Sequence, residues 1–217
     1  MKEKQYIDKV EDYFNHIRMD AIELIPTENR NGNMLEIGAA DGSTLLYCKK
    51  NGYAENITGV ELCQIEGSLQ NSTEFDDFII GDIESIDLPF KESSFDVILC
   101  LDVLEHLVDP SALLQKIKTY LKDDGVLITS IPNIRELMTM INIFFKGDFK
   151  YTDSGVLDKT HLRFFCKKNI IDLFLDNEFK IVKITDAKNG KRSVVNRLTF
   201  GFFEEFITAQ YYTVLRK

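Results

Sequence analysis

The sequence predicts an α/β protein built on a doubly wound, mostly parallel β-sheet. Apolar runs of strand length recur along the chain, and segments with helical periodicity separate them. Because strands that are buried on both faces are apolar throughout, such runs are typical of a parallel sheet covered by helices on both sides. Right-handed crossovers between the parallel strands then give the doubly wound arrangement. The 217 residues, 44% of them hydrophobic and 28% charged, suit a single domain.

The first half of the chain is expected to hold a helical cap and four strands. Helical periodicity covers the first 25 residues and stops at Pro26, so residues 1–30 are expected to form an N-terminal helical cap. An apolar run at residues 34–37 indicates a buried strand, and the helix that follows Gly42 closes at Asn51-Gly52. Three further strands are expected at residues 57–61, 78–80 and 95–101.

The second half is expected to complete the sheet. Asp109 matches a helix N-cap and Pro110 the first helical position, and this helix is expected to end at residues 123–125. Residues 126–131 follow as a fifth strand, after which the pattern loosens and residues 133–165 form an insert. The remaining segment, residues 167–217, is expected to add a helix at 167–177 and late strands at 179–184 and 207–215.

The net charge and the cysteine content of the chain indicate which binding partners and which cellular compartment to expect. The chain has 26 Lys and Arg against 35 Asp and Glu, a net charge of −9, which disfavours binding to nucleic acid. No apolar run approaches the ~18 residues of a membrane span, and no secretory signal is visible. We therefore expect a cytoplasmic protein without a metal site, and we leave its oligomeric state open. Its four cysteines, none in a C-x-x-C pair, are Cys48, Cys63, Cys100 and Cys166.

The most informative segment runs from the first strand through a turn of small residues into a helix. Small residues at Gly38 and Gly42 let a ligand approach the backbone, and the helix that follows offers free N–H groups. Glu61 ends the next strand, 61 − 42 = 19 residues past Gly42, where a carboxylate can accept hydrogen bonds from both hydroxyls of a ribose. This pattern favours a nucleotide or carboxylate site, and the alternative is a purely structural strand-to-helix turn.

A nicotinamide-dependent oxidoreductase fits this turn poorly. The dinucleotide fingerprint G-x-G-x-x-G would require glycine at positions 38, 40 and 43, but the chain has Ala40 and Ser43. A phosphate-binding P-loop is also absent, because no G-K-[ST] triplet follows a strand.

The spacing Glu36-x-Gly38-x-x-x-Gly42 resembles motif I of the class I S-adenosylmethionine-dependent methyltransferases, with Ala40 in place of the middle glycine. The resemblance implies a Rossmann-like, seven-stranded sheet that is mostly parallel and has an antiparallel last strand. It also implies S-adenosyl-L-methionine as the cofactor and residues 34–131 as the cofactor-binding core.

Further motifs extend this resemblance in the same order along the chain. Glu61 matches the acidic residue that binds the ribose, Asp82 the residue that faces the adenine amine, and residues 95–107 resemble ubiquinone-biosynthesis O-methyltransferases. From the residues alone, Asp82 could instead cap a turn and Leu101 could serve only in the core. The implied cofactor contacts are Glu36, Gly38, Ala39, Asp41, Gly42, Glu61, Leu62, Asp82, Ile83 and Leu101.

The insert has a resemblance of its own. Residues 147–155 and 157–165 are similar to a bacterial methyltransferase group found with glycosyltransferases and surface-polysaccharide genes. The aromatic residues Phe144, Phe145, Phe149 and Tyr151 of the insert at 133–165 could form a lid over the acceptor, and the alternative is a plain hydrophobic helix face. The resemblance implies that the acceptor is a small-molecule hydroxyl, such as that of a sugar or glycan precursor. Two alternatives stay open: an N- or C-methyltransferase of another metabolite, and an S-adenosylmethionine-binding module without catalysis.

Two histidines are the candidates for a catalytic base, since a histidine with a pKa near neutrality can take a proton from a hydroxyl. The i, i+3, i+4 spacing of Asp102, Glu105 and His106 would place all three on one face of a helix. His106 could otherwise orient the turn in which it lies. Near His161, Asp158 could hold the imidazole, and the alternative function of this segment is a polar clamp between the insert and the sheet.

Overall fold

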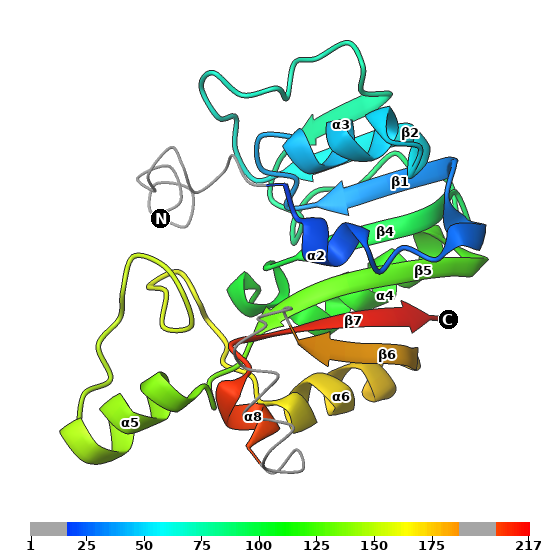
Figure 1. The fold of residues 1–217 in the computed structure, drawn as a ribbon. Coiled ribbons are helices and arrows are strands. Elements are labelled where there is room, and N and C mark those ends of the chain that lie inside the picture. Colours follow the sequence, from blue (N-terminus) through cyan, green and yellow to red (C-terminus); the bar gives the residue numbers. More distant parts are fainter. Residues whose placement is uncertain (1–16, 187–202) are drawn as a thin grey trace.

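The computed structural model describes residues 17–186 and 203–217 and contains one seven-stranded sheet with helices on both faces (Figure 1). The strand order is β3-β2-β1-β4-β5-β7-β6. Strands β1 to β5 pair in parallel, whereas β7 is antiparallel to both β5 and β6. The predicted α/β fold, with a mostly parallel sheet and an antiparallel last strand, is confirmed.

The seven strands lie within a few residues of their predicted positions. They are β1 (Gly32–Ile37), β2 (Ala54–Glu61), β3 (Asp77–Ile80), β4 (Phe95–Leu101), β5 (Leu121–Pro132), β6 (Lys180–Asp186) and β7 (Gln210–Arg216). The predicted end of the preceding helix at residues 123–125 is wrong, because the chain is already extended at Leu121 and pairs there with Phe95. The last strand is predicted to begin at residue 207, but in the structure it begins later, at Gln210, because the short helix α8 ends at Ile207.

The described helices are α2 (Met19–Ile22), α3 (Ser43–Lys50), α4 (Pro110–Tyr120), α5 (Leu137–Lys146), α6 (Lys167–Asp176) and α8 (Glu204–Ile207). Two single 3₁₀ turns, η2 (Thr27–Asn29) and η3 (Leu104–His106), accompany them. Helix α4 begins as predicted, because the Asp109 side chain accepts a hydrogen bond of 3.1 Å from the N–H of Ala112 and Pro110 follows at the first position. Most of the predicted N-terminal helix lies outside the described residues.

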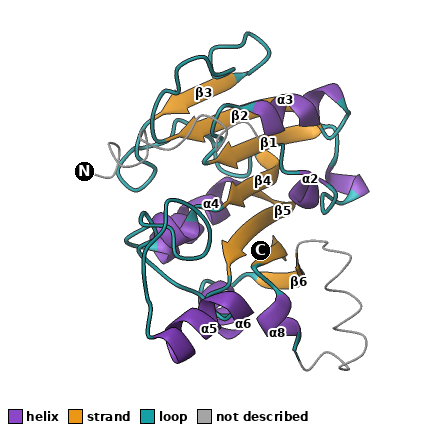
Figure 2. Cartoon of the chain, turned by 60° about the vertical axis from the view of Figure 1, so that its left-hand side comes forward, coloured by secondary structure: helices purple, strands orange, loops and turns teal. Residues whose placement is uncertain are grey.

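The central strand β4 shows why its sequence is apolar throughout. Its side chains alternate between two buried clusters, with Val97 and Leu99 packed on the side of α2 and α3 and Ile98 and Cys100 on the side of α4 and α6. Figure 2 shows α3 and α4 on opposite faces of the sheet. A strand covered on both faces has no position for a polar side chain except at its ends.

The parallel strands β1 to β4 therefore present their polar groups at one edge, where their carboxyl ends lie. In Figure 1 this edge is on the left, the same side as α5 and the loop that follows it. Within residues 17–186 and 203–217, none of the helices has the length and apolar character that would let it cross a bilayer.

Truncation of a core side chain on α4 should destabilise this fold. Leu114 is fully buried between α4 and the sheet, so Leu114→Ala should lower the free energy of unfolding by about 2–5 kcal/mol through lost contacts and a cavity. Urea denaturation monitored by circular dichroism measures the change. The matched control is Leu175→Ala on α6, which is 55% exposed and should change the free energy of unfolding little. Equal losses for the two variants would contradict the described packing.

Candidate active site

A pocket opens at the edge where β1, β2, β3 and β4 end. It encloses about 820 Å³, a figure that includes the part open to solvent. Strands β2 and β3, which follow β1, lie on one side of it in the sheet, and β4 and β5 lie on the other side. The pocket therefore lies at the point where the strand order reverses, which is where open α/β sheets bind ligands. Six residues predicted from the sequence line the pocket: Gly38, Glu61, Leu62, Asp82, Ile83 and His106.

The turn after β1 needs small residues for two physical reasons. Gly38, Ala40 and Gly42 have φ angles of 74°, 47° and 87°, in the left-handed region that glycine adopts at little cost. A Cβ atom added to Gly38 would lie 2.5 Å from Cγ2 of Val103, and one added to Gly42 would lie 2.6 Å from Cζ of Phe75. The turn is therefore closely packed, and at Gly38 it presents bare backbone to the pocket.

Glu61 joins the end of β2 to this turn. Its Oε2 accepts a hydrogen bond of 2.8 Å from the N–H of Ala40, and its Oε1 accepts one of 2.6 Å from the N–H of Leu62. Burial raises the pKa of the Glu61 carboxyl, and the backbone N–H groups partly offset this effect. The backbone N–H groups of Ala40, Leu62 and Cys63 all bond to this carboxylate, which has about four acceptor positions, so it can still accept a hydrogen bond from a hydroxyl in the pocket.

Glu36 is a buried carboxyl in β1, close behind the turn. Its Oε2 has no hydrogen-bond partner within the described part of the chain. Burial raises the pKa of Glu36 to about 8, the positive charge of Arg18 opposes the rise, and the negative charges of Glu61 and Asp41 add to it. A buried polar atom without a partner is costly, and it commonly marks a position that a ligand completes.

The position of Asp102 differs from the prediction that it shares one helix face with Glu105 and His106. The turn η3 spans only Leu104–His106, and Asp102 precedes it with a φ of 55°, so Asp102 does not share a helix face with Glu105 and His106. Its carboxylate lies 2.8 Å from Nη1 of Arg18 and accepts a hydrogen bond of 2.8 Å from Ser130. The ion pair and the hydrogen bond hold Asp102 in this position. The role of Arg18 could not be predicted from the sequence, because nothing in the residues around it distinguishes it from a surface arginine.

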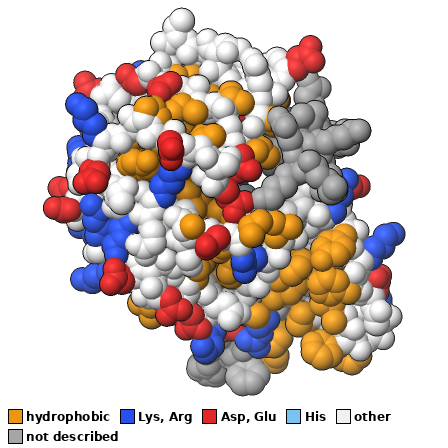
Figure 3. All heavy atoms as spheres, turned by 180° about the vertical axis from the view of Figure 1, so that it is seen from behind, with side chains coloured by type: hydrophobic (Ala, Val, Ile, Leu, Met, Phe, Trp, Pro, Cys, Tyr) orange, Lys and Arg blue, Asp and Glu red, His pale blue; other side chains and the backbone are white. Residues whose placement is uncertain are grey.

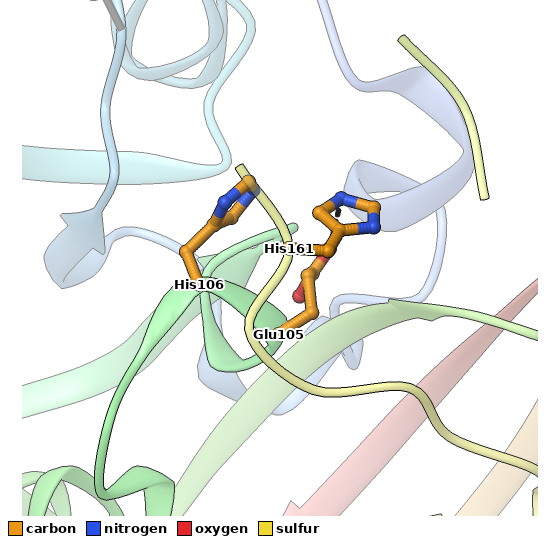
Figure 4. A group of neighbouring side chains, drawn as sticks. All are labelled: Glu105, His106 and His161. Carbon is orange, nitrogen blue, oxygen red and sulfur yellow. Dashed lines mark ion pairs between the residues drawn. The ribbon is translucent and has the colours of Figure 1, made fainter. Parts of the chain in front are cut away.

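His106 and His161 come together although they lie far apart in the sequence (Figure 4). Their ring centroids are 4.8 Å apart, and Nε2 of His161 lies 4.0 Å from Oε1 of Glu105. Nδ1 of His106 is 3.0 Å from the carbonyl oxygen of Thr160, and Nδ1 of His161 is 3.0 Å from that of Val156. A carbonyl only accepts hydrogen bonds, so both Nδ1 atoms carry hydrogen, and in a neutral ring the lone pair is on Nε2.

The backbone of η3 holds the segment that carries His161. The carbonyl oxygen of Glu105 accepts hydrogen bonds of 2.8 Å and 3.0 Å from the N–H groups of Leu162 and Arg163. The guanidinium of Arg163 donates back to the carbonyl of Leu107 at 3.2 Å. This arrangement is the polar clamp that the sequence offered as an alternative, and it fixes the distance between the two histidines.

The other predicted residues lie around the pocket and do not line it. Ala39 and Leu101 belong to the buried cluster on the side of α3. Asp41 accepts a hydrogen bond of 3.0 Å from the N–H of Ser43 at the start of α3. Asp82, which lines the pocket, also makes the turn-capping contact that the sequence offered as an alternative, because its Oδ1 accepts a hydrogen bond of 3.0 Å from the N–H of Glu84. The carbonyl of Val156 accepts a hydrogen bond from Nδ1 of His161, and the suggested contact of Asp158 with this imidazole stays a prediction.

The sheet order, the tight turn after β1 and the pocket beside Glu61 define a class I S-adenosylmethionine-dependent methyltransferase. The family model described as "Methyltransferase domain" matches residues 10–184, and the chain belongs to this family. Its cofactor is S-adenosylmethionine.

Several known proteins resemble this chain in sequence or in fold. An uncharacterised protein of Methanocaldococcus jannaschii is 25% identical over 92% of this chain and 84% of its own length. A ubiquinone biosynthesis O-methyltransferase of Actinobacillus pleuropneumoniae is 28% identical over 55% of this chain and 53% of its own length. A Thermotoga maritima structure, described as an S-adenosylmethionine-dependent methyltransferase and possible histamine N-methyltransferase, aligns over 100% of both chains with a TM-score of 0.64 at 20% identity.

The buried carboxyl of Glu36 should make stability depend on pH. Its pKa of about 8 in the folded chain lies above the ordinary value of 4.5, so the folded state binds more protons between these values. The free energy of unfolding should therefore fall as the pH rises from 5 to about 9, and Glu36→Gln should remove this part of the fall. Urea denaturation of the ligand-free protein at several pH values measures it. The exposed Glu66→Gln control should keep the original pH dependence, and an unchanged profile in Glu36→Gln would refute the assignment.

Proposed function

We propose that this methyltransferase acts on a hydroxyl group of a small molecule, namely a sugar or glycan precursor. The observation that carries the proposal is the division of the pocket between two sets of residues. Glu61 and Asp82 lie on the side where β2 and β3 end, whereas His106 lies on the side of η3. A cofactor-binding wall and a proton-accepting wall in one pocket fit the transfer of a methyl group to an acceptor that must lose a proton.

The chain's own residues fit S-adenosylmethionine. The Glu61 carboxylate is suited to accept hydrogen bonds from the ribose hydroxyls, and Asp82 is suited to accept from the adenine amine, with Leu62 and Ile83 as apolar neighbours. The partnerless Oε2 of Glu36 suits the cationic methionine end of the cofactor. The turn residues assigned to this end of the cofactor are Gly38, Ala39, Asp41 and Gly42, and Leu101 is assigned a packing role behind them.

The histidines handle the proton of the acceptor. When bound, S-adenosylmethionine would supply an activated methyl group on a cationic sulfur, a good leaving group. The chain aligns the two reactants and excludes water. Either His106 or His161 can receive the hydroxyl proton at Nε2, since the carbonyls of Thr160 and Val156 fix the hydrogen on Nδ1. His106 is the one that lines the pocket.

The insert at residues 133–165 supports the sugar part of the proposal. Rings of Phe149, Tyr151 and Phe164 lie edge-on or tilted at centroid distances of 5.7–6.2 Å, and the Phe164 ring lies 6.3 Å from that of His161. Phe149 and Tyr151 are about half exposed. Figure 3 shows apolar side chains gathered at the end of the molecule where α5 lies. Aromatic rings beside a candidate base provide a wall against which the apolar face of a sugar ring can pack.

The related ubiquinone biosynthesis enzyme is named as an O-methyltransferase, which also favours a hydroxyl acceptor. The four cysteines are all unpaired thiols, in keeping with a reducing compartment, so we place the activity in the cytoplasm.

Replacement of Glu61 should weaken cofactor binding. Glu61→Ala removes the acceptor of the ribose hydroxyls and the tie to Ala40, so the Kd for S-adenosylhomocysteine should rise by at least about tenfold. Isothermal titration calorimetry measures the affinity. Glu55→Ala changes an exposed carboxylate on the same strand and should leave the Kd unchanged. An unaltered Kd in Glu61→Ala would overturn the placement of the ribose.

The acceptor class is tested with a panel of nucleotide sugars, glycans, phenols and amines in a methyl-transfer assay. The expected product carries the new methyl group on a sugar oxygen, which mass spectrometry and NMR spectroscopy locate. Methylation of amines or carbon atoms alone would overturn the proposal in favour of an N- or C-methyltransferase. Cofactor binding without any product would favour a binding module.

A further inference from the structure

We propose that Glu105, His106 and His161 bind a divalent first-row transition-metal cation at the acceptor side of the pocket (Figure 4). The binding itself is independent of the function proposed above, whereas its catalytic consequence rests on that function. No metal is expected from the sequence, because the outer ligands lie 161 − 105 = 56 positions apart and no ligand spacing of a known metal motif is present.

The three side chains converge closely enough to share one ion. One ligand atom from each residue lies within 4.8 Å of the others. An ion held at about 2.0–2.1 Å from nitrogen and oxygen ligands places them roughly 3–3.5 Å apart, so small side-chain rotations complete the site. Glu105 is 1% exposed and His161 is 8% exposed. These are enclosed groups at the end of a pocket, unlike the carboxylates that gather on a solvated surface.

The histidines are already in the tautomer that a metal requires. Both donate Nδ1–H to a backbone carbonyl, at Thr160 and at Val156, which leaves the ligand lone pair on Nε2. A metal-binding histidine usually makes this kind of hydrogen bond through its other ring nitrogen, because the bond fixes both the tautomer and the ring orientation. Two such hydrogen bonds on neighbouring histidines are an observation independent of their proximity.

The backbone also holds the ligands at a fixed separation. The carbonyl of Glu105 accepts from the N–H groups of Leu162 and Arg163, directly after the ligand His161. The segments that carry the three ligands are thus hydrogen-bonded to each other at the ligands themselves. Such support keeps a site within the small tolerance that metal coordination demands.

The donor set points to the class of ion. Two imidazoles with one carboxylate suit zinc, manganese, iron or cobalt, whereas magnesium and calcium prefer sites made of oxygen ligands alone. Three protein ligands leave coordination positions for water or substrate, as in catalytic rather than structural sites. His106 lines the pocket, so these positions are accessible to an acceptor in it.

A cation here would activate the acceptor directly. A hydroxyl bound to the cation has a lowered pKa and releases its proton to water. An oxygen electron pair then forms the new bond to the methyl carbon, while the pair of the carbon–sulfur bond stays on sulfur. In this arrangement His106 and His161 hold the cation and do not take up the proton.

The binding test uses the full chain, stripped with a chelator and dialysed, and Co²⁺ as the probe. Calorimetry and visible absorption should show one saturable site, and Glu105→Gln and His161→Ala should each raise the Kd for Co²⁺ at least about tenfold. The exposed Glu92→Gln control should bind as the parent does. Circular dichroism and the Kd for S-adenosylhomocysteine report whether each variant is folded. Absence of saturable Co²⁺ binding by the parent chain, or a Kd for Co²⁺ in both ligand variants equal to that of the parent, would overturn the site.

The activity test separates the two proposals. With a hydroxyl acceptor, chelator treatment should lower the methyl-transfer rate at least about 100-fold and leave the Kd for S-adenosylhomocysteine unchanged, and Mn²⁺ or Zn²⁺ should restore the rate. An undiminished rate after chelation would overturn the catalytic role of the cation and leave the histidines as bases. Saturable Co²⁺ binding without a product from any hydroxyl acceptor would support the site and overturn the proposed acceptor class.

Discussion

Helices cover the central strands β1 and β4 on both faces, so the side chains within these strands are withdrawn from solvent. In a parallel sheet this constraint leaves the carboxyl edge as the place where polar groups can reach a ligand. Glu61 stands at the end of β2, and Asp82 lies two residues beyond the end of β3. The pocket is therefore a consequence of how the sheet is buried, and the turn after β1 adapts it to a cofactor that approaches the backbone.

The features that could be predicted from the sequence are those that depend on residues close together along the chain. The strand positions, the cap at Asp109 and the glycine turn each depend on residues a few positions apart, and the spacing to Glu61 follows from one strand–helix–strand unit. The left-handed conformation of Asp102 depends on distant groups at Arg18 and Ser130. The pairing of two histidines likewise depends on hydrogen bonds that join segments more than fifty residues apart, which no local pattern records.

Carboxyl groups at this edge are kept out of water at a cost in stability. Burial raises the pKa of both Glu36 and Glu61, so in the ligand-free chain their charged forms are disfavoured. A cationic ligand offsets that cost when it binds, so part of its affinity comes from relieving unfavourable burial. The buried carboxyl groups thus lower the stability of the ligand-free protein and raise its affinity for a cationic ligand, and such an opposition between stability and function is common at functional sites.

Strand β7 lies between β5 and β6 in the sheet, although it is the last of the seven strands to be synthesised. Until it is made, β5 and β6 each have an open edge with unpaired backbone groups, and such edges can pair with other chains. A ribosome-bound nascent chain would consequently carry an unfinished sheet to a late stage of translation. Premature termination before Gln210 would leave a product that is prone to aggregate rather than a smaller working enzyme.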